Sequence, residues 1–306
     1  MLIDEIVDFC DKKYTTLGEK CGCVNCNHPI KQCSKNCYDC LYQIHYPNQE
    51  KVAKGEQKVL YDCPKMLFHY ICQYSYMYAT ELLYAFEYEK EYLRDYPRFN
   101  IMSLGCGGCA DLMGLERFKI DNNLNQPISY IGFDVNKNWF VINNKTAKYC
   151  EQNQIKYKVL YDDVFKCFRR SGVHNTNIVV VSYLISYLYN TKQIQVIDSF
   201  LDDFTQNVIA KKGKDEKLLL IVNDVNTYKR GRNYFKRFAD KINDYNLSII
   251  KMEYKYFDTG NLFDGQKIGS PYVFRGCAFT PPYTILNKYH TDINCKQTIQ
   301  LLLEVV

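Results

Sequence analysis

Five short apolar runs lie between residues 100 and 224, separated by stretches with helical periodicity, and this alternation constrains the fold most strongly. The runs are apolar at successive positions, which is typical of strands buried on both faces of a sheet. Strands that alternate with helices need crossover connections and therefore predict a parallel sheet covered by helices. The runs cover residues 100–105, 128–134, 155–161, 177–184 and 217–224, and the helical stretches cover residues 137–152 and 191–211.

The pattern changes in the last part of the chain, where residues 247–258 and 271–280 form longer runs without a helical pattern between them. We expect these runs to pair antiparallel at the sheet edge. The predicted fold class is therefore α/β, with a mostly parallel seven-stranded Rossmann-like sheet and an antiparallel C-terminal edge pair. We expect an N-terminal helix with a Cys-rich metal-binding module over residues 1–60, a helical connection packing on the core over 61–98, and the α/β domain over 99–306.

A long helix is predicted ahead of the sheet, over residues 63–96, because apolar residues recur there at spacings of three and four. Pro64 lies near its start and Pro97 ends it. We expect the tyrosine-rich stripe of this helix to be core packing. The stripe includes Tyr70, Tyr74 and Tyr78.

The first predicted strand runs into a glycine-rich turn, SLGCGGCADLMGL over residues 103–115, which opens a helix. Gly105 and Gly107 allow a tight turn and let backbone N–H groups approach a ligand. Two interpretations stay open. The stretch from Gly105 to Ala110 is a partial match to the NAD fingerprint G-x-G-x-x-G. It also matches the shorter G-x-G turn of S-adenosylmethionine (SAM) methyltransferases.

Acidic residues follow the second and third predicted strands. Asp134 stands at the end of the second strand, and Asp162 and Asp163 stand at the end of the third. Asp111 lies in the first turn of the helix after the glycine turn. The carboxyl ends of neighbouring parallel strands share one edge of a sheet, and nucleotides bind at that edge.

This ordered set of glycines and acids makes residues 99–280 resemble class I SAM-dependent methyltransferases. The resemblance implies SAM as the cofactor, with Asp134 on the ribose hydroxyls and Asp163 near the adenine. The fourth strand lacks the Asn/Asp-Pro-Pro-Tyr motif that is common in enzymes acting on adenine or cytosine amino groups, which argues against that acceptor. The residues assigned to SAM are Gly105, Gly107, Asp111, Asp134, Asp162 and Asp163.

The end of the fourth strand is where this resemblance places the methyl acceptor, within SYLISYLYN at residues 182–190. Ser182, Tyr183 and Ser186 are therefore candidates for the acceptor pocket. None of them is a strong general base, and positioning supplies much of the rate in an in-line methyl transfer. We assign no catalytic residue.

Residues 21–40 contain six cysteines and a histidine, out of fifteen cysteines in the chain. Clustered cysteines in a reducing compartment are more often metal ligands than disulfides. Two C-x2-C pairs are typical of a zinc site, and eight ligands would fill two tetrahedral sites, so we predict one or two zinc ions. The predicted ligands are Cys21, Cys23, Cys26, His28, Cys33, Cys37, Cys40 and His45.

Iron–sulfur clusters are the alternatives to zinc. Cys33, Cys37 and Cys40 have the C-x3-C-x2-C spacing of radical-SAM enzymes, but Asp39 stands where those enzymes usually have an aromatic residue. The segment also precedes the first strand instead of following it. A non-catalytic Fe–S cluster fits better, although less well than zinc. A module of this kind often binds nucleic acid or protein, so a protein partner is also expected.

The net charge of +5 permits a nucleic-acid partner. The best basic segment, residues 226–238, follows the fifth strand and interleaves cations with aromatic rings, a mixture that can grip phosphates and stack bases. A solvated helix face is the alternative interpretation. The nucleic-acid candidates, with RNA favoured, are Lys229, Arg230, Arg232, Lys236 and Arg237.

The sequence has no run of about eighteen apolar residues and no signal-peptide pattern at its start, so we expect no membrane association and a cytoplasmic location. Three functions stay open. The first is a SAM-dependent methyltransferase with RNA or another nucleic acid as a candidate acceptor. The second is a non-catalytic methyltransferase-like protein that binds a nucleotide or nucleic acid. The third is a SAM or NAD enzyme of different chemistry on the same scaffold.

Overall fold

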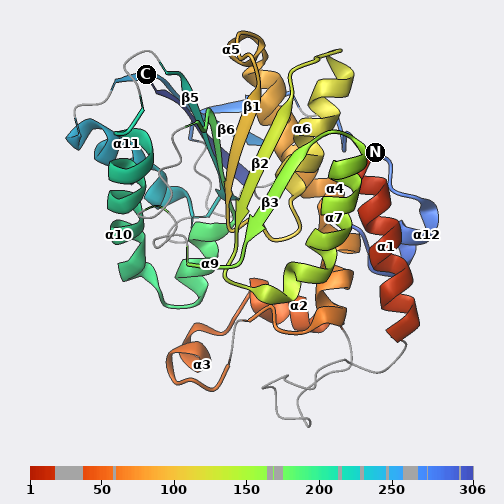
Figure 1. Cartoon of the computed structure of the whole chain (residues 1–306). Coiled ribbons are helices and arrows are strands. Elements are labelled where there is room, and N and C mark those ends of the chain that lie inside the picture. Colours follow the sequence, from red (N-terminus) through yellow and green to blue (C-terminus); the bar gives the residue numbers. More distant parts are fainter. Residues whose placement is uncertain are drawn as a thin grey trace.

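An eight-stranded sheet forms the centre of the molecule, with the strand order β3-β2-β1-β4-β5-β8-β6-β7 (Figure 1). The computed structural model describes residues 1–17, 37–57, 60–163, 168, 175–212, 216–227, 231–245, 248–257, 268–273, 275–295 and 298–305. The strands are β1 (Phe99–Leu104), β2 (Ile128–Phe133), β3 (Lys156–Leu160), β4 (Ile178–Ser182), β5 (Leu218–Val225), β6 (Ile249–Phe257), β7 (Ser270–Tyr272) and β8 (Thr298–Val305).

The sheet is mostly parallel. Strands β3, β2, β1, β4 and β5 all pair in parallel, and β8 pairs antiparallel with both β5 and β6. β8 therefore runs against every other strand. This arrangement confirms the predicted α/β class, with an antiparallel strand in the C-terminal part of the sheet.

Two details of the predicted sheet were wrong. The sheet has eight strands where seven were predicted, because residues 298–305 form a further strand that is buried along its whole length. The predicted strand over residues 271–280 shrinks to β7, which pairs in parallel with β6. Gly276 follows β7 with a φ of 101°, a backbone conformation that an extended strand does not adopt, so the run cannot continue as predicted.

Helices cover both faces of the sheet and confirm the predicted helical stretches. The predicted long helix is present as α4 followed by the short α5. The helices are α1 (Leu2–Leu17), α2 (Cys37–His45), α3 (Gln49–Ala53), α4 (Pro64–Tyr88), α5 (Lys90–Arg94), α6 (Ala110–Asp121), α7 (Phe140–Gln152), α9 (Leu184–Asn190), α10 (Ile194–Phe204), α11 (Phe235–Asp244) and α12 (Tyr283–Tyr289), with shorter turns η1 (Lys137–Trp139), η2 (Thr205–Ile209) and η3 (Arg232–Tyr234).

Two hydrophobic cores result from the alternation of side chains along the strands. Ile101 and Val180 face a core shared with α1, α4, α6, α7 and α12. Met102 and Val181, one residue further along the same strands, face a second core shared with α9, α10 and α11. Figure 1 shows these two helical layers on opposite sides of the sheet.

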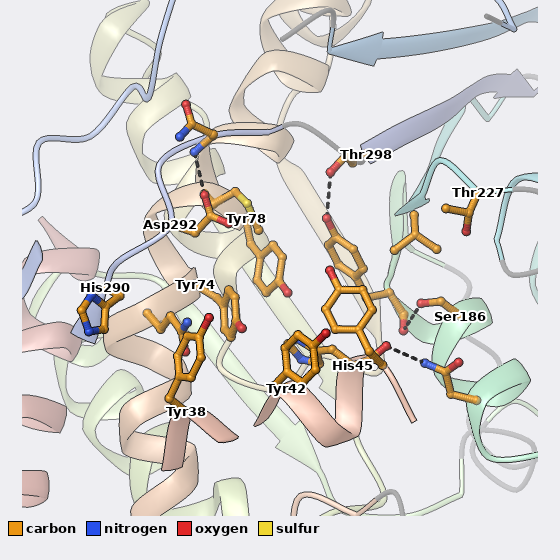
Figure 2. Close-up of a pocket in the computed structure, with 17 residues that line it drawn as sticks. Tyr38, Tyr42, His45, Tyr74, Tyr78, Ser186, Thr227, His290, Asp292 and Thr298 are labelled. Atoms are coloured by element: carbon orange, nitrogen blue, oxygen red, sulfur yellow. Dashed lines mark hydrogen bonds between the residues drawn. The ribbon is translucent and has the colours of Figure 1, made fainter. Parts of the chain in front are cut away.

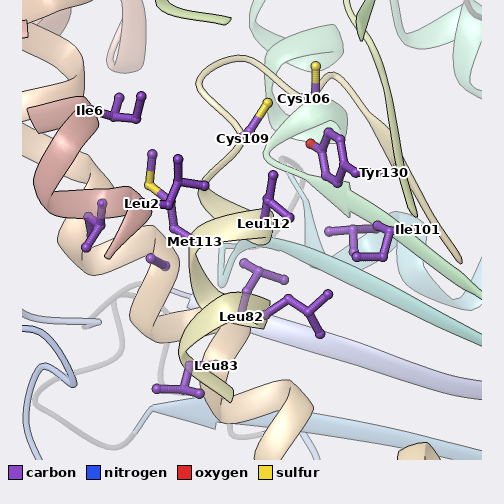
Figure 3. Close-up of a cluster of buried hydrophobic side chains, with 14 of the residues drawn as sticks. Leu2, Ile6, Leu82, Leu83, Ile101, Cys106, Cys109, Leu112, Met113 and Tyr130 are labelled. Carbon is purple, nitrogen blue, oxygen red and sulfur yellow. The ribbon is translucent and has the colours of Figure 1, made fainter. Parts of the chain in front are cut away.

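The N-terminal helix α1 belongs to the first of these cores. Its apolar side chains Leu2 and Ile6 are fully buried and belong to the same cluster as Leu82 of α4 and Met113 of α6, and Figure 3 shows Leu2 near Met113. The backbone N–H of Leu2 donates a hydrogen bond to Glu116 Oε2 of α6 at 2.7 Å. Each fully buried leucine or isoleucine side chain contributes about 2 kcal/mol to stability, so α1 is held firmly on the sheet's helical layer.

Helices α4 and α6 approach so closely at Gly114 that only a glycine fits. A Cβ atom at this position would lie 2.7 Å from the carbonyl oxygen of Ala79 and 3.1 Å from the backbone N of Leu83. We expect Gly114→Ala to lower the free energy of unfolding by about 2 kcal/mol, because two backbones must separate. The higher helix propensity of alanine alone would raise the free energy of unfolding by about 1 kcal/mol. Urea unfolding that shows a more stable Gly114→Ala variant would therefore contradict the close contact between α4 and α6.

Within the ranges given above, no helix is both long and apolar enough to cross a membrane.

Candidate active site

The connections of the sheet reverse direction between β1 and β4, which are neighbours. Ligands of open α/β sheets bind in the crevice outside the carboxyl ends of the strands at such a reversal. Gly105 directly follows β1, and Leu184 opens α9 after β4. A Cβ atom at Gly105 would lie 3.4 Å from Leu184 Cδ1, so the two loops meet at this crevice.

The glycine turn after β1 is fixed to the end of β2 by backbone hydrogen bonds. The N–H groups of Gly105 and Cys106 both donate to the carbonyl of Phe133, at 2.8 and 3.0 Å. Gly105 has a φ of 67° and Gly107 a φ of 48°, in the left-handed region that favours glycine. Gly105 is exposed, so its backbone is open to a ligand.

Asp134, the residue after β2, holds this turn in place. Its Oδ2 accepts a hydrogen bond from Gly107 N–H at 2.9 Å, and its Oδ1 accepts one from Asn136 N–H at 2.8 Å. Burial raises the pKa of Asp134 to about 6, while the two backbone N–H groups oppose that rise. The side chain is therefore ionised at neutral pH. A carboxylate can accept about four hydrogen bonds, so Asp134 keeps the capacity to bind a pair of ribose hydroxyls.

The other predicted cofactor residues divide into two groups. Asp162 and Asp163 follow β3, one strand beyond Asp134, and are half-buried. Asp111 instead lies in the core with 4% of its surface exposed, where its Oδ1 accepts a hydrogen bond from the Tyr130 hydroxyl at 2.9 Å. Asp111 thus links the first turn of α6 to β2 through Tyr130. The carboxylates at the strand ends are Asp134, Asp162 and Asp163.

Tyr61 covers the carboxyl end of β1. Its carbonyl accepts a hydrogen bond from Asn136 Nδ2 at 2.7 Å, which ties it to the end of β2. Its ring lies 6.5 Å from the Trp139 ring and 6.1 Å from the Tyr187 ring of α9, after β4. Because β1 lies between β2 and β4, the segment with Tyr61 spans the two sides of the crevice.

A cavity of about 660 Å³ opens beside this crevice (Figure 2). It lies between α2, α4, α9, the end of β5 and the start of β8, and two of the three acceptor-pocket candidates, Tyr183 and Ser186, line it. Tyr183 precedes Leu184, whose side chain lies beside Gly105, so cavity and crevice adjoin. Tyr74 and Tyr78 of the tyrosine stripe of α4 pack in a hydrophobic cluster as predicted, and both also line the cavity. Its six tyrosines are Tyr38, Tyr42, Tyr46, Tyr74, Tyr78 and Tyr183.

A buried carboxylate that the sequence analysis missed lies behind Tyr183. Glu81 of α4 is 0% exposed, and its Oε2 accepts hydrogen bonds from the Tyr183 hydroxyl at 2.9 Å and from Asn223 Nδ2 at 3.0 Å. The hydroxyl of Thr298 also donates to Glu81. Burial raises the pKa of Glu81 to about 7. The available signal was an isolated acid on an otherwise apolar helix face.

The loop after β4 is held by a second buried acid. Asp224 of β5 is fully buried, and its Oδ2 accepts hydrogen bonds from the N–H groups of Ile185 and Ser186 at 3.0 Å each. These N–H groups belong to the first turn of α9, so Asp224 stabilises the helix start. The third candidate for the acceptor pocket, Ser182, joins the Glu81 network, because its Oγ accepts a hydrogen bond from Asn223 Nδ2 at 3.2 Å.

The predicted metal module falls mostly outside the described residues. Cys21, Cys23, Cys26, His28 and Cys33 lie there, whereas Cys37 and Cys40 lie one turn apart on α2. His45 lies in the aromatic cluster, with its Nε2 3.0 Å from the Tyr61 hydroxyl. Among the described residues no group of three or more metal-binding side chains occurs, so zinc stays a prediction.

The predicted basic segment is not one continuous cationic surface in its described part. Arg232 is 3% exposed and donates a hydrogen bond to Asn226 Oδ1 at 3.1 Å. Arg237 forms an ion pair with Asp198 at 2.7 Å, and Lys236 is exposed. Lys229 and Arg230 lie outside the described residues.

No family model and no curated protein matches this chain. Among solved structures, a SAM-dependent methyltransferase from Archaeoglobus fulgidus is 14% identical with a TM-score of 0.41, over 74% of this chain and 94% of that chain. A S-adenosylmethionine-dependent methyltransferase from Clostridium acetobutylicum ATCC 824 is 8% identical with a TM-score of 0.40, over 88% and 98%. TrmN from Thermus thermophilus is 9% identical with a TM-score of 0.39, over 85% and 52%. These TM-scores are too low to assign a function.

Proposed function

We propose that this chain is a SAM-dependent methyltransferase. The observation that carries the proposal is the exposed glycine turn that is hydrogen-bonded to Asp134 at the reversal point of the sheet, beside the tyrosine-lined cavity. A SAM site needs an open backbone turn, a strand-end acid for the ribose and a neighbouring space for the acceptor. Gly105, Asp134 and the cavity supply these three elements.

Each part of the site would have a distinct task. Bound SAM would supply an electrophilic methyl group. The Gly105–Gly107 turn and Asp134 would bind the cofactor, with Asp162 and Asp163 at the adenine side. Tyr61 would exclude water from the crevice, and the tyrosines of the cavity would orient the acceptor. Positioning of two reactants in this way accounts for a large share of the rate in such a displacement.

Calorimetric titration of the purified protein with SAM tests the proposal. We expect saturable binding with one site per chain, and S-adenosylhomocysteine should compete for that site. The absence of SAM binding, or tight NAD binding in its place, would reject the proposal in favour of a different enzyme on this scaffold. SAM binding without transfer of a labelled methyl group to any RNA, protein or small-molecule fraction would favour the non-catalytic alternative.

We propose further that the Cys-rich segment holds zinc. Cys37 and Cys40 of α2 are spaced like one pair of ligands in a structural site. Elemental analysis of the protein as purified should find one or two zinc ions per chain, and a strong chelator should lower the melting temperature. Ser substitution of both cysteines should lower the zinc content, whereas substitution of the buried Cys150 of α7 should not. Iron in place of zinc would contradict this metal assignment.

A further inference from the structure

The walls of the cavity are mainly the faces and edges of tyrosine rings. Tyr74 and Tyr78 of α4 stack with ring centroids 5.6 Å apart, and Tyr78 lies 4.5 Å from Tyr183. Tyr42 lies 5.0 Å from the Tyr46 ring at the exposed rim. Figure 2 shows the rings of Tyr38, Tyr42, Tyr74 and Tyr78 gathered around one space. Several electron-rich ring faces around one volume are an arrangement that attracts cations.

The described part of the cavity wall carries a negatively charged side chain, which suits a cationic ligand. Asp292 lines the cavity, half-buried, and its Oδ1 accepts a hydrogen bond from Asn294 N–H at 2.9 Å. His45 also lines it, with its Nε2 3.0 Å from the Tyr61 hydroxyl. Among the described lining residues there is no lysine or arginine. A phosphate group would therefore meet a carboxylate and ring faces, whereas an ammonium group would meet complementary partners.

We infer that the cavity is the methyl-acceptor site and that the acceptor is an organic amine, held in its protonated form by the tyrosine rings and Asp292. This inference rests on the proposed function. A volume of about 660 Å³ suits a small molecule or a single side chain. Tyr183 joins the two halves of the site, because it lines the cavity and adjoins the loop that touches Gly105.

The reaction of an amine balances without any further reagent. The bound ammonium loses one proton to solvent, which exposes the nitrogen lone pair. That lone pair forms the new N–C bond as the C–S bond of SAM breaks, and the sulfur keeps the electron pair of the broken bond. The products are a methylated ammonium and neutral S-adenosylhomocysteine. The amine therefore needs the cation site for binding and orientation, and no strong base is required in the wall.

Choline and its neutral isostere 3,3-dimethyl-1-butanol are the probes for this site, because they share one shape and differ in charge. In ligand-observed NMR titrations of the protein saturated with S-adenosylhomocysteine, we expect choline to bind at least tenfold more tightly than the isostere. Equal affinities for the two probes would overturn the inference. The sulfonium of SAM is a second cation that these rings could hold. If SAM displaces choline whereas S-adenosylhomocysteine does not, the cation site belongs to the cofactor and the acceptor assignment is wrong.

Variants at the rim test the same site without disturbing the core. Tyr42 is 55% exposed, so Tyr42→Leu should fold normally and reduce choline affinity about fivefold, whereas Tyr42→Phe should keep it because the ring remains. Asp292→Asn, which retains the oxygen bonded to Asn294, should also reduce it. The matched control is Tyr283→Leu, at an exposed tyrosine of α12 that does not line the cavity. Unchanged choline affinity in both Tyr42→Leu and Asp292→Asn would reject the cavity as the cation site.

The proposed function and this inference fail in different ways. If SAM does not bind but choline is preferred over the isostere, the cation site stands and the methyltransferase proposal falls. If SAM binds and its methyl group is transferred to labelled RNA but not to small amines, the methyltransferase proposal stands and the amine acceptor is rejected.

Discussion

Replacement of Asp134 by alanine should lower the affinity for SAM about 100-fold, which corresponds to about 2.7 kcal/mol. Two effects combine in this loss. The variant removes the carboxylate that would accept hydrogen bonds from the ribose, and hydrogen bonds to charged groups contribute about 1.5–3 kcal/mol each. It also frees the Gly107 N–H, which lies 2.9 Å from Asp134 Oδ2, so the glycine turn loses its tie to the end of β2.

Calorimetric titration with SAM measures this effect, and circular dichroism checks that the variant is folded. Asp121→Ala is the matched control, because Asp121 lies at the end of α6 in a surface ion pair with Arg117 at 2.8 Å. Such a pair contributes roughly 0–1 kcal/mol and has no part in the site. An Asp134→Ala variant that binds SAM as tightly as Asp121→Ala would show that the strand-end acid is not a cofactor ligand.

Glu81 should make the stability of the protein fall as the pH rises from about 4.5 to about 7. Burial raises the pKa of Glu81 from its ordinary value of 4.5 to about 7 in the folded chain. Between these two pKa values the folded state binds more protons than the unfolded state, so the free energy of unfolding decreases with pH. The raised pKa corresponds to roughly 3 kcal/mol at most, and above pH 7 the loss is complete.

Glu81→Gln isolates this contribution, because the amide has the shape of the protonated acid and no charge to lose. We expect its free energy of unfolding, measured in urea at pH 5 and pH 7.5, to change by about 2 kcal/mol less than that of the wild type, because this window covers most but not all of the range between the two pKa values. Relative to the wild type, Glu81→Ala should lose roughly 4 kcal/mol at pH 5, because Tyr183 and Asn223 are left with unpaired buried groups, and about 2 kcal/mol less than that at pH 7.5, where the wild type has lost the contribution of Glu81. Parallel pH profiles for the wild type and Glu81→Gln would contradict the assignment.

The local parts of the fold and site were predictable from the sequence. Each parallel strand was visible as an apolar run, and the Gly105 turn and Asp134 follow directly from where those runs end. Such features depend on a few consecutive residues and on the rule that parallel strands share one ligand-binding edge. The turn and the acid lie together in the structure, with Gly107 N–H bonded to Asp134.

The long-range parts of the fold were not predictable in the same way. Five of the eight residues in 298–305 are apolar, but their pattern does not say that they pair between β5 and β6. Periodicity identifies a buried strand and leaves its neighbours unspecified. The cavity poses the same difficulty, because its walls come from segments as distant as Tyr42 and Asp292. The stripe of Tyr74 and Tyr78 has the spacing of any buried helix face, so spacing alone could not distinguish a cavity wall from core.

The position of β8 has a consequence for how the chain reaches its native state during translation. β6 and β7 are joined to the rest of the sheet through β8, yet β8 is synthesised after both of them. A nascent chain that has emerged only as far as residue 290 therefore lacks β8. The edges of β5 and β6 that pair with β8 in the folded protein have no hydrogen-bonding partner at that stage. Exposed strand edges of this kind invite association with other chains. β8 thus closes the sheet, and the interval before it is synthesised is when these strand edges are open to other chains.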